Sequence, residues 1–254
     1  MVYINKNMVI NQLQEVIENS FEKKVANLPK SFQQQQLQAI EILKKSILYE
    51  EVIEEAISFN RSLDWDYDNL NVKLTTTAEE LVDVFKLRSD VFRSIDYLDE
   101  FPDTIDGLNF DIYDKNSAII YYKNNNQPSG TIRLIFDSKN KLPSEEKSCF
   151  ISMRKEYGKI GKISRNVVLN EGKGLNLEFK YLMCGIYNIF INNDIDIALS
   201  GIKQEHLKLF KKLGGVEVIE ELESYGTLDV PCYIISYNPN HASKFFKKVF
   251  LNQR

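Results

Sequence analysis

The chain has 254 residues, of which 43% are hydrophobic and 27% are charged, and its formal net charge is -4. This length and composition predict a globular protein made of one large domain, or of one domain and an extension. The acidic balance gives no general case for nucleic-acid binding. No apolar run reaches the roughly 18 residues that a membrane-spanning helix needs.

The first residues lack the basic-then-apolar layout of a secretory signal. The cysteines and histidines are few and widely spaced, and none of their spacings is typical of a zinc site. They are Cys149, Cys184, Cys232, His206 and His241. We therefore expect a reduced, cytoplasmic, soluble protein without a metal site, in which Cys184 belongs to the core and His206 lies at the surface.

The N-terminal part is predicted to be helical. Residues 8–25 carry apolar side chains at helical spacing, Pro29 interrupts the pattern, and a second pattern runs from about 32 to 57. We interpret residues 1–63 as a helical extension that packs either on the main domain or on a partner.

A polar, aromatic linker separates this extension from a domain that we expect to span residues 70–254. Thr77 is followed three residues later by Glu80, which is the arrangement of a capping box, so a helix is predicted to begin there. Its apolar face ends near Phe92. The acidic residues 96–110, which include a proline and a glycine, are expected to form a loop.

Strands and helices alternate through the rest of the domain. Strands are predicted at 72–75, 117–123, 129–137, 160–169, 195–201, 215–224 and 231–237, and further helices at 175–192, 205–214 and 243–251. Residues 138–159 are expected to be a loop. Two helical crossovers imply parallel neighbours, and the hairpins imply antiparallel ones. The sequence therefore predicts an α/β fold with a mixed, mostly antiparallel central sheet and flanking helices.

Charged residues interrupt the first hairpin of this sheet. Asp111 and Asp114 stand just ahead of its first strand, and Arg133 stands inside its second strand. A guanidinium inside a sheet is costly to desolvate unless carboxylates pair with it, ideally in a bidentate manner. We therefore expect the two aspartates to pair with Arg133.

The order of elements resembles the GNAT acyltransferase fold. Residues 171–183 place Gly172 and Gly174 between a strand and a helix, and residues 205–215 resemble the late helix of that fold. The resemblance implies that a phosphate is bound by the free backbone N–H groups of this glycine turn. The chain departs from the usual pyrophosphate loop, because Leu169 stands where a Gln or an Arg is expected.

Four short motifs resemble one branch of these enzymes, the N-acyl-homoserine-lactone (autoinducer) synthases and the related N-acyl amino acid synthases. They occur in the family's order and with similar spacing, over about residues 72–215. The family has a glutamate at the first position of the last motif, where this chain has a lysine. The motifs are Arg88-x-x-x-Phe92, Asp111-x-x-Asp114, Gly130-x-x-Arg133-Leu134 and Lys162-x-Ser164-Arg165.

The resemblance implies an electrostatic cluster near the acceptor site. Its catalytic set would be Arg88, Asp111, Asp114, Arg133 and Arg165. Its substrate-binding set would be Phe92, Lys162, Ser164, Val167, Val168, Gly172 and Gly174. The alternative is that the cluster is architectural and only locks a helix to the sheet.

The implied reaction joins an amine to an acyl thioester, so the amine must first lose a proton. A paired aspartate has a low pKa and is a weak base, so the identity of the base stays open. A backbone N–H from residues 167–169 is expected to stabilise the oxyanion.

The implied activity is N-acyl transfer from an acyl-carrier-protein or coenzyme A thioester to the amine of an amino acid or derivative. No tightly bound cofactor is expected. S-adenosylmethionine would be the acceptor of a lactone synthase, and Lys162 favours the amino-acid version. The rivals are an acetyl-CoA-dependent acetyltransferase and a non-catalytic module that binds an acyl ligand or a protein.

An acidic carrier protein would need a basic docking surface. Candidates are Arg154, Lys155, Lys159, Lys162, Lys211, Lys212, Lys244, Lys247 and Lys248. The basic amphipathic stretch at 243–251 is expected to dock on the domain's own core rather than on a membrane.

Overall fold

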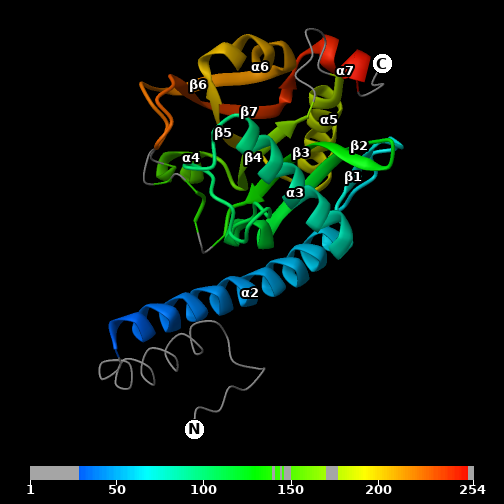
Figure 1. Cartoon of the computed structure of the whole chain (residues 1–254). Helices are drawn as coiled ribbons and strands as arrows, with labels where there is room; N and C mark the ends of the chain where they lie inside the picture. Colours follow the sequence, from blue (N-terminus) through cyan, green and yellow to red (C-terminus); the bar gives the residue numbers. More distant parts are fainter. Residues whose placement is uncertain (1–28, 139–140, 144, 146–149, 170–176, 251–254) are drawn as a thin grey trace. The chain divides into compact units, whose positions relative to one another are not determined.

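The structure is a computed structural model, and it describes residues 29–138, 141–143, 145, 150–169 and 177–250 (Figure 1). The predicted helix at 8–25 lies outside the described residues, as do Cys149, Gly172 and Gly174. The chain divides into two compact units, residues 1–53 and residues 54–254.

Helix α2 (Lys30–Ser62) begins in the first unit and ends in the second. Of the first unit, only residues 29–53 are described. Within the second unit, the buried Asn60 fixes the last turns of α2 to the sheet, because its amide donates to the carbonyl of Ser117 at 2.9 Å and accepts from the N–H of Ile119 at 3.0 Å. The domain boundary placed at 63–70 stays a prediction.

The second unit is built on a seven-stranded sheet in the order β1-β2-β3-β4-β5-β7-β6 (Figure 1). The strands are β1 (Val72–Leu74), β2 (Ser117–Asn124), β3 (Gln127–Phe136), β4 (Ile160–Val168), β5 (Ile197–Lys203), β6 (Gly214–Leu222) and β7 (Cys232–Ala242). Among these strands β4 and β5 pair in parallel and every other neighbouring pair is antiparallel. The predicted mixed, mostly antiparallel sheet is therefore confirmed.

Helices cover both faces of the sheet. They are α3 (Ala78–Ser94) on one face, and α5 (Leu177–Asn192), α6 (Leu207–Leu213) and α7 (Lys244–Phe250) on the other (Figure 1). Because side chains alternate along a strand, Leu134 and Ile163 pack under α5 in the main core, while Arg133 and Ser164 face α3. The main core also holds Phe246, so α7 docks on the domain as expected.

Among the helical connections, the one through α5 joins the parallel neighbours β4 and β5. The one through α6 joins β5 and β6, which are parallel to each other but are separated by β7. The connection from β1 through α3 leads to β2, which pairs antiparallel with β1. Residues 95–116 run between α3 and β2 and return the chain to the other end of the sheet, so β2 runs opposite to β1.

Two short helices were not predicted. The 3-10 helix η1 (Ile112–Asn116) ends the acidic loop, and α4 (Ile151–Glu156) lies inside the predicted loop at 138–159. Arg154 of α4 donates to Asp137 at 2.6 Å and to Glu145 at 3.1 Å. These contacts join residues that are 9 and 17 positions apart in the chain, so the local pattern of apolar residues does not predict α4.

No helix among the described residues is both long and apolar enough to cross a membrane.

Candidate active site

Ion pairs join the first set of predicted residues into one cluster, which brings together α3, η1, β3 and β4. Arg133 Nη1 and Nη2 contact the two oxygens of Asp111 at 2.7 and 3.1 Å, and Arg133 Nη1 also lies 3.0 Å from Asp114 Oδ2. Arg88 Nη1 donates to Asp114 Oδ1 at 2.8 Å, and Arg165 Nη2 donates to Asp111 Oδ2 at 2.9 Å. The five predicted side chains are therefore in contact.

The carboxylates are oriented by their own backbone. Asp111 Oδ1 accepts from the N–H of Tyr113 at 2.9 Å, and Asp114 Oδ2 accepts from the N–H of Asp111 at 2.9 Å. This reciprocal capping begins η1. It holds both carboxylates toward the sheet, where Arg133 meets them.

The cluster has a buried end and an end that faces a cavity. The side chains of Arg88 and Asp114 are fully buried, whereas those of Asp111 and Arg165 are 28% and 11% exposed. Burial opposes the ionisation of Asp111, but Arg133 and Arg165 outweigh it and lower the pKa of Asp111 well below 3.8. Burial lowers the pKa of Arg165 to about 10, although Asp111 opposes this shift. Asp111 is therefore a weak base at neutral pH.

Strand β4 changes partners beside the cluster. It pairs with β5 only at Ile160, Gly161 and Lys162, and beyond Lys162 the two strands separate. On its other side, Thr131 and Arg133 of β3 pair with Val167 and Ser164, so β4 has one residue more than β3 over this stretch. Arg165 lies in this bulge with a φ of 51°. The bulge turns its guanidinium toward Asp111 and the rings of α3 and the acidic loop.

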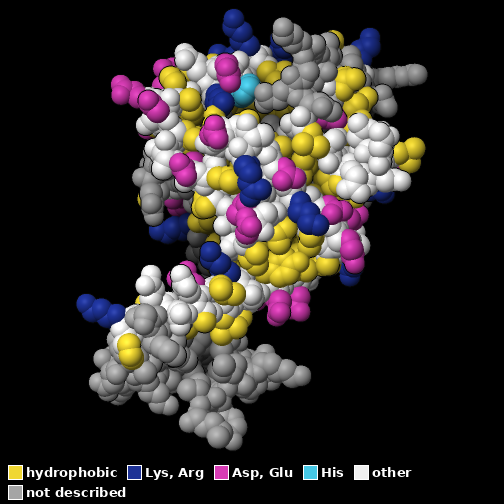
Figure 2. All heavy atoms as spheres, viewed as in Figure 1, with side chains coloured by type: hydrophobic (Ala, Val, Ile, Leu, Met, Phe, Trp, Pro, Cys, Tyr) yellow, Lys and Arg dark blue, Asp and Glu magenta, His cyan; other side chains and the backbone are white. Residues whose placement is uncertain are grey.

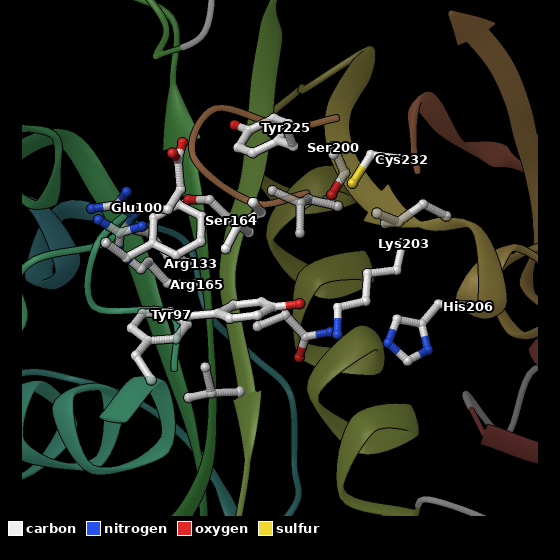
Figure 3. Close-up of a pocket in the computed structure, with 18 of the residues that line it drawn as sticks. Tyr97, Glu100, Arg133, Ser164, Arg165, Ser200, Lys203, His206, Tyr225 and Cys232 are labelled. Carbon is white, nitrogen blue, oxygen red and sulfur yellow. The ribbon is translucent and has the colours of Figure 1, made fainter. Parts of the chain in front are cut away.

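A cavity of about 480 Å³ opens where β4 and β5 separate (Figure 3). Side chains of α3, the acidic loop, β4, β5, α6 and the β6–β7 connection line it. Phe179 and Phe210 contribute an apolar wall, and Asp111, Arg133 and Arg165 bring the ionic cluster to its edge.

The described members of the predicted substrate-binding set also line the cavity. Phe92 is buried against Val167, and Ser164 accepts a hydrogen bond from Arg133 Nε at 3.0 Å. Lys162 is only 5% exposed and donates through Nζ to the carbonyl of Pro143 at 2.7 Å.

The amides of residues 167–169 differ in their availability. The N–H of Leu169 donates to the carbonyl of Ser129 at 2.8 Å, so it is used within the sheet. Because the amides of an antiparallel strand alternate in direction, the neighbouring Val168 directs its N–H toward the gap beside β5. Of the three residues, Val168 is therefore the one placed to meet an oxyanion in the cavity.

Three further cavity residues, Tyr97, Glu100 and Lys203, were not predicted from the sequence, whereas His206 is exposed as expected and also lines the cavity. Tyr97 and Glu100 come from the acidic loop, Lys203 from the end of β5, and His206 from the turn before α6 (Figure 3). Glu100 Oε2 accepts from the N–H and the hydroxyl of Thr227 at 2.7 and 3.1 Å, which joins the acidic loop to the β6–β7 connection. An aromatic residue in an acidic loop was the available signal for Tyr97.

The predicted basic docking surface needs a correction. Lys162 is buried, and Arg154 is paired with Asp137 and Glu145, so neither forms an open basic surface. Figure 2 shows basic and acidic side chains interspersed on the visible face, with apolar patches between them. The exposed lysines of α6 and α7 remain candidates.

Within the described ranges, no three His, Cys, Asp or Glu side chains are grouped closely enough to hold a metal ion. Cys184 lies in the core, and burial raises the pKa of its thiol to about 12. The residues that line the cavity supply hydrogen-bond donors, guanidinium and ammonium groups, and apolar walls. Such a site can bind a polar acceptor beside an acyl chain.

Solved structures share this fold. FeeM, an N-acyl amino acid synthase from uncultured soil microbes, superimposes with a TM-score of 0.52 at 18% identity, over 66% of this chain and 89% of that chain. LasI, an AHL synthase, superimposes with a TM-score of 0.53 at 16% identity, over 69% of this chain and 92% of that chain. The structure of BjaI, a CoA-dependent acyl-homoserine lactone synthase with SAM and isopentyl-CoA, superimposes with a TM-score of 0.52 at 17% identity. The match covers 68% of this chain and 81% of that chain.

No curated protein sequence matches the chain significantly. A family match, however, covers residues 83–251, which is about two thirds of the chain. It begins within α3 and covers η1, β2 to β7 and the whole ionic cluster. The chain belongs to the family described as N-acyl amino acid synthase FeeM, and it is an acyltransferase.

Proposed function

We propose that this acyltransferase moves an acyl chain from a pantetheine thioester to the amine of an amino acid or a close derivative. The carrying observation is the cavity between β4 and β5, which has an ionic cluster at one edge and apolar walls at another. The arrangement suits a polar acceptor that meets an acyl thioester in the gap. Pantetheine is common to coenzyme A and to acyl carrier protein, so the gap itself does not distinguish these donors.

The charge of the cavity wall supports an amino acid as acceptor. Arg133, Lys162, Arg165 and Lys203 are cationic, while Glu100 and Asp111 are the lining carboxylates. An excess of positive charge favours a carboxylate-bearing acceptor and disfavours the sulfonium cation of S-adenosylmethionine. Lys162 contributes to this excess at the position where the motif of the resembled family has a glutamate.

The amine must be deprotonated before it attacks the thioester. Asp111 is a poor candidate for the base because two guanidinium groups hold its carboxylate in the ionised state. We assign Asp111 the role of positioning Arg133 and Arg165 instead. The amine nitrogen then attacks the carbonyl carbon, and the Val168 N–H stabilises the oxyanion.

Acyl carrier protein is our preferred source of the donor. Helix α6 forms part of the cavity wall through Leu209 and Phe210, and its outer surface carries the exposed Lys208, Lys211 and Lys212. The start of helix α7 lies beside the end of α6, since the N–H of Ser243 donates to the carbonyl of Leu213 at 2.7 Å. A basic surface beside the cavity suits an acidic carrier protein.

Purified protein tests the proposal directly. It would be mixed with one thioester at a time, as acetyl-CoA, long-chain acyl-CoA or long-chain acyl carrier protein, and with single amino acids or S-adenosylmethionine. Free thiol and product mass would be followed together. We expect thiol release that depends on a long acyl chain and an amino acid, with an N-acyl amino acid as product. Release with acetyl-CoA alone, or only with S-adenosylmethionine, would contradict the proposal.

A further inference from the structure

The hydroxyl of Tyr97 is a buried polar group at the cavity that no described residue satisfies. Two cavity-lining side chains have a buried polar atom without a hydrogen-bond partner among the described residues, Tyr97 at Oη and Arg165 at Nε. The Arg165 guanidinium lies over the rings of Phe92 and Phe101, whereas the Tyr97 hydroxyl extends into the cavity (Figure 3). An unpaired buried hydroxyl is destabilising, so its position calls for a bound partner.

The ring of Tyr97 is held firmly on both sides. Its backbone N–H donates to the carbonyl of Phe92 at 2.8 Å, and its carbonyl accepts from the N–H of Phe101 at 2.9 Å. The ring packs in a small apolar cluster with Phe92 and Val167 of β4. Lys203 of β5 places Nζ 4.8 Å from the ring centroid. Tyr97 therefore lies against both strands beyond the point where they separate, and its hydroxyl points toward the gap between them.

The same gap receives the amide of Val168. Tyr97 packs against the cluster that contains Val167, and the next residue, Val168, directs its N–H toward β5. An amide and a phenol thus reach one space from the sheet and from the acidic loop. Two donors on one space suit a single oxygen that gains negative charge.

We propose that the Tyr97 hydroxyl donates a hydrogen bond to the thioester carbonyl oxygen and to the oxyanion formed from it, which makes Tyr97 a catalytic residue. The assignment rests on the proposed acyl transfer. The amine lone pair forms the C–N bond, and the carbonyl π pair moves to the oxygen that Tyr97 and Val168 hold. When C=O re-forms, the C–S bond breaks and the thiolate leaves. The amine proton passes to base or solvent, the thiolate is protonated, and Tyr97 keeps its proton throughout.

Tyr97→Phe tests this role because it keeps the ring contacts and removes only the hydroxyl. Tyr237→Phe is a matched control, since Tyr237 Oη is also buried without a partner among the described residues but belongs to the main core and not to the cavity lining. We expect Tyr97→Phe to melt no lower than wild type and to lose on the order of 100-fold in kcat. The KM of the amine acceptor should stay within about twofold of wild type, since the lost contact acts on the thioester. Tyr237→Phe should keep wild-type kcat.

An unchanged kcat in Tyr97→Phe would overturn the proposal. So would a raised acceptor KM with unchanged kcat, because the hydroxyl would then hold the acceptor and not the thioester.

Binding of unreactive probes separates this inference from the proposed function. The probes are a pantetheine thioether whose acyl mimic carries a ketone, and the same thioether without the ketone. Wild type should bind the ketone on the order of tenfold more tightly than the plain thioether, and this preference should be several-fold smaller in Tyr97→Phe, which keeps only the Val168 amide. The same preference in both proteins, or no binding of the ketone probe to wild type, would overturn the proposal. If the preference is found but no amine is acylated, only the proposed function fails.

Discussion

Arg133 is tolerated inside the sheet because the two carboxylates of η1 surround its guanidinium. Asp111 meets it with both oxygens, and the fully buried Asp114 bridges it to Arg88. A sequence reading could predict these partners, because an arginine in a central strand requires carboxylates. It could not predict that the carboxylates cap a 3-10 helix, since that depends on the local backbone of residues 111–116.

The substitution Asp114→Ala should destabilise the protein strongly. It would leave Arg88 and Arg133 buried with one carboxylate fewer, which costs about 3–5 kcal/mol in comparable pairs. Urea denaturation measures the free energy of unfolding. Asp106→Ala is the control, because Asp106 is exposed and its ion pair, Oδ1 to Arg93 Nη2 at 3.6 Å, lies in solvent. This substitution should change the free energy of unfolding by less than about 1 kcal/mol. Equal effects of the two substitutions would contradict the role given to the buried cluster.

Asp111 should make the stability depend on acid. Its pKa in the folded protein is depressed below 3.8 by Arg133 and Arg165, against the effect of burial. Its stabilisation is therefore present above about pH 4 and is lost as the pH falls through the lower folded value. The difference in unfolding free energy between wild type and Asp111→Asn should be nearly constant down to about pH 4 and should narrow from there to pH 2. A difference that stays constant over this lower range would mean that Asp111 is not held ionised by its neighbours.

The segments that sequence patterns missed are those that depend on contacts between distant residues. Helix α3 was predictable because Thr77 and Glu80 form a local capping box. Helix α4 was not, because Arg154 links it to Asp137 and Glu145. Likewise, the bulge that turns Arg165 requires the register of β3 and β4, which single-strand alternation does not contain.

Helix α6 gives a prediction about the donor. Lys211→Glu with Lys212→Glu should slow transfer from acyl carrier protein by about tenfold or more at low salt, because a docking surface would change sign. Transfer from acyl-pantetheine should be nearly unchanged, since Phe210 and the cavity wall remain. Initial rates at low and high salt measure both effects.

A matched control carries the same charge change elsewhere. Lys73→Glu with Lys86→Glu alters two exposed lysines on β1 and α3. Equal losses in both double variants, or an equal loss with acyl-pantetheine, would contradict docking on α6.

On the scale of the whole molecule, the fold and the activity class were predicted correctly from the sequence. The reason is that the four motifs occur in the family's order along the chain, and the sheet brings them together. The family match confirms the predicted acyltransferase. The cavity was less predictable. Tyr97, Lys203 and Tyr225 lie far apart in sequence, and they line one cavity only when the acidic loop, β5 and the β6–β7 connection assemble.

The central claim is that the chain makes an N-acyl amino acid. The most direct measurement is untargeted mass spectrometry of organic extracts from cells that express the protein. The controls are cells with the empty vector and cells with an Arg133→Lys variant shown to be folded, which keeps the charge but loses the bidentate contact with Asp111. We predict N-acylated amino acids in the wild-type extract that are absent or strongly reduced in both controls. Extracts that contain acyl-homoserine lactones instead, or no acylated amine at all from a folded protein, would contradict the account.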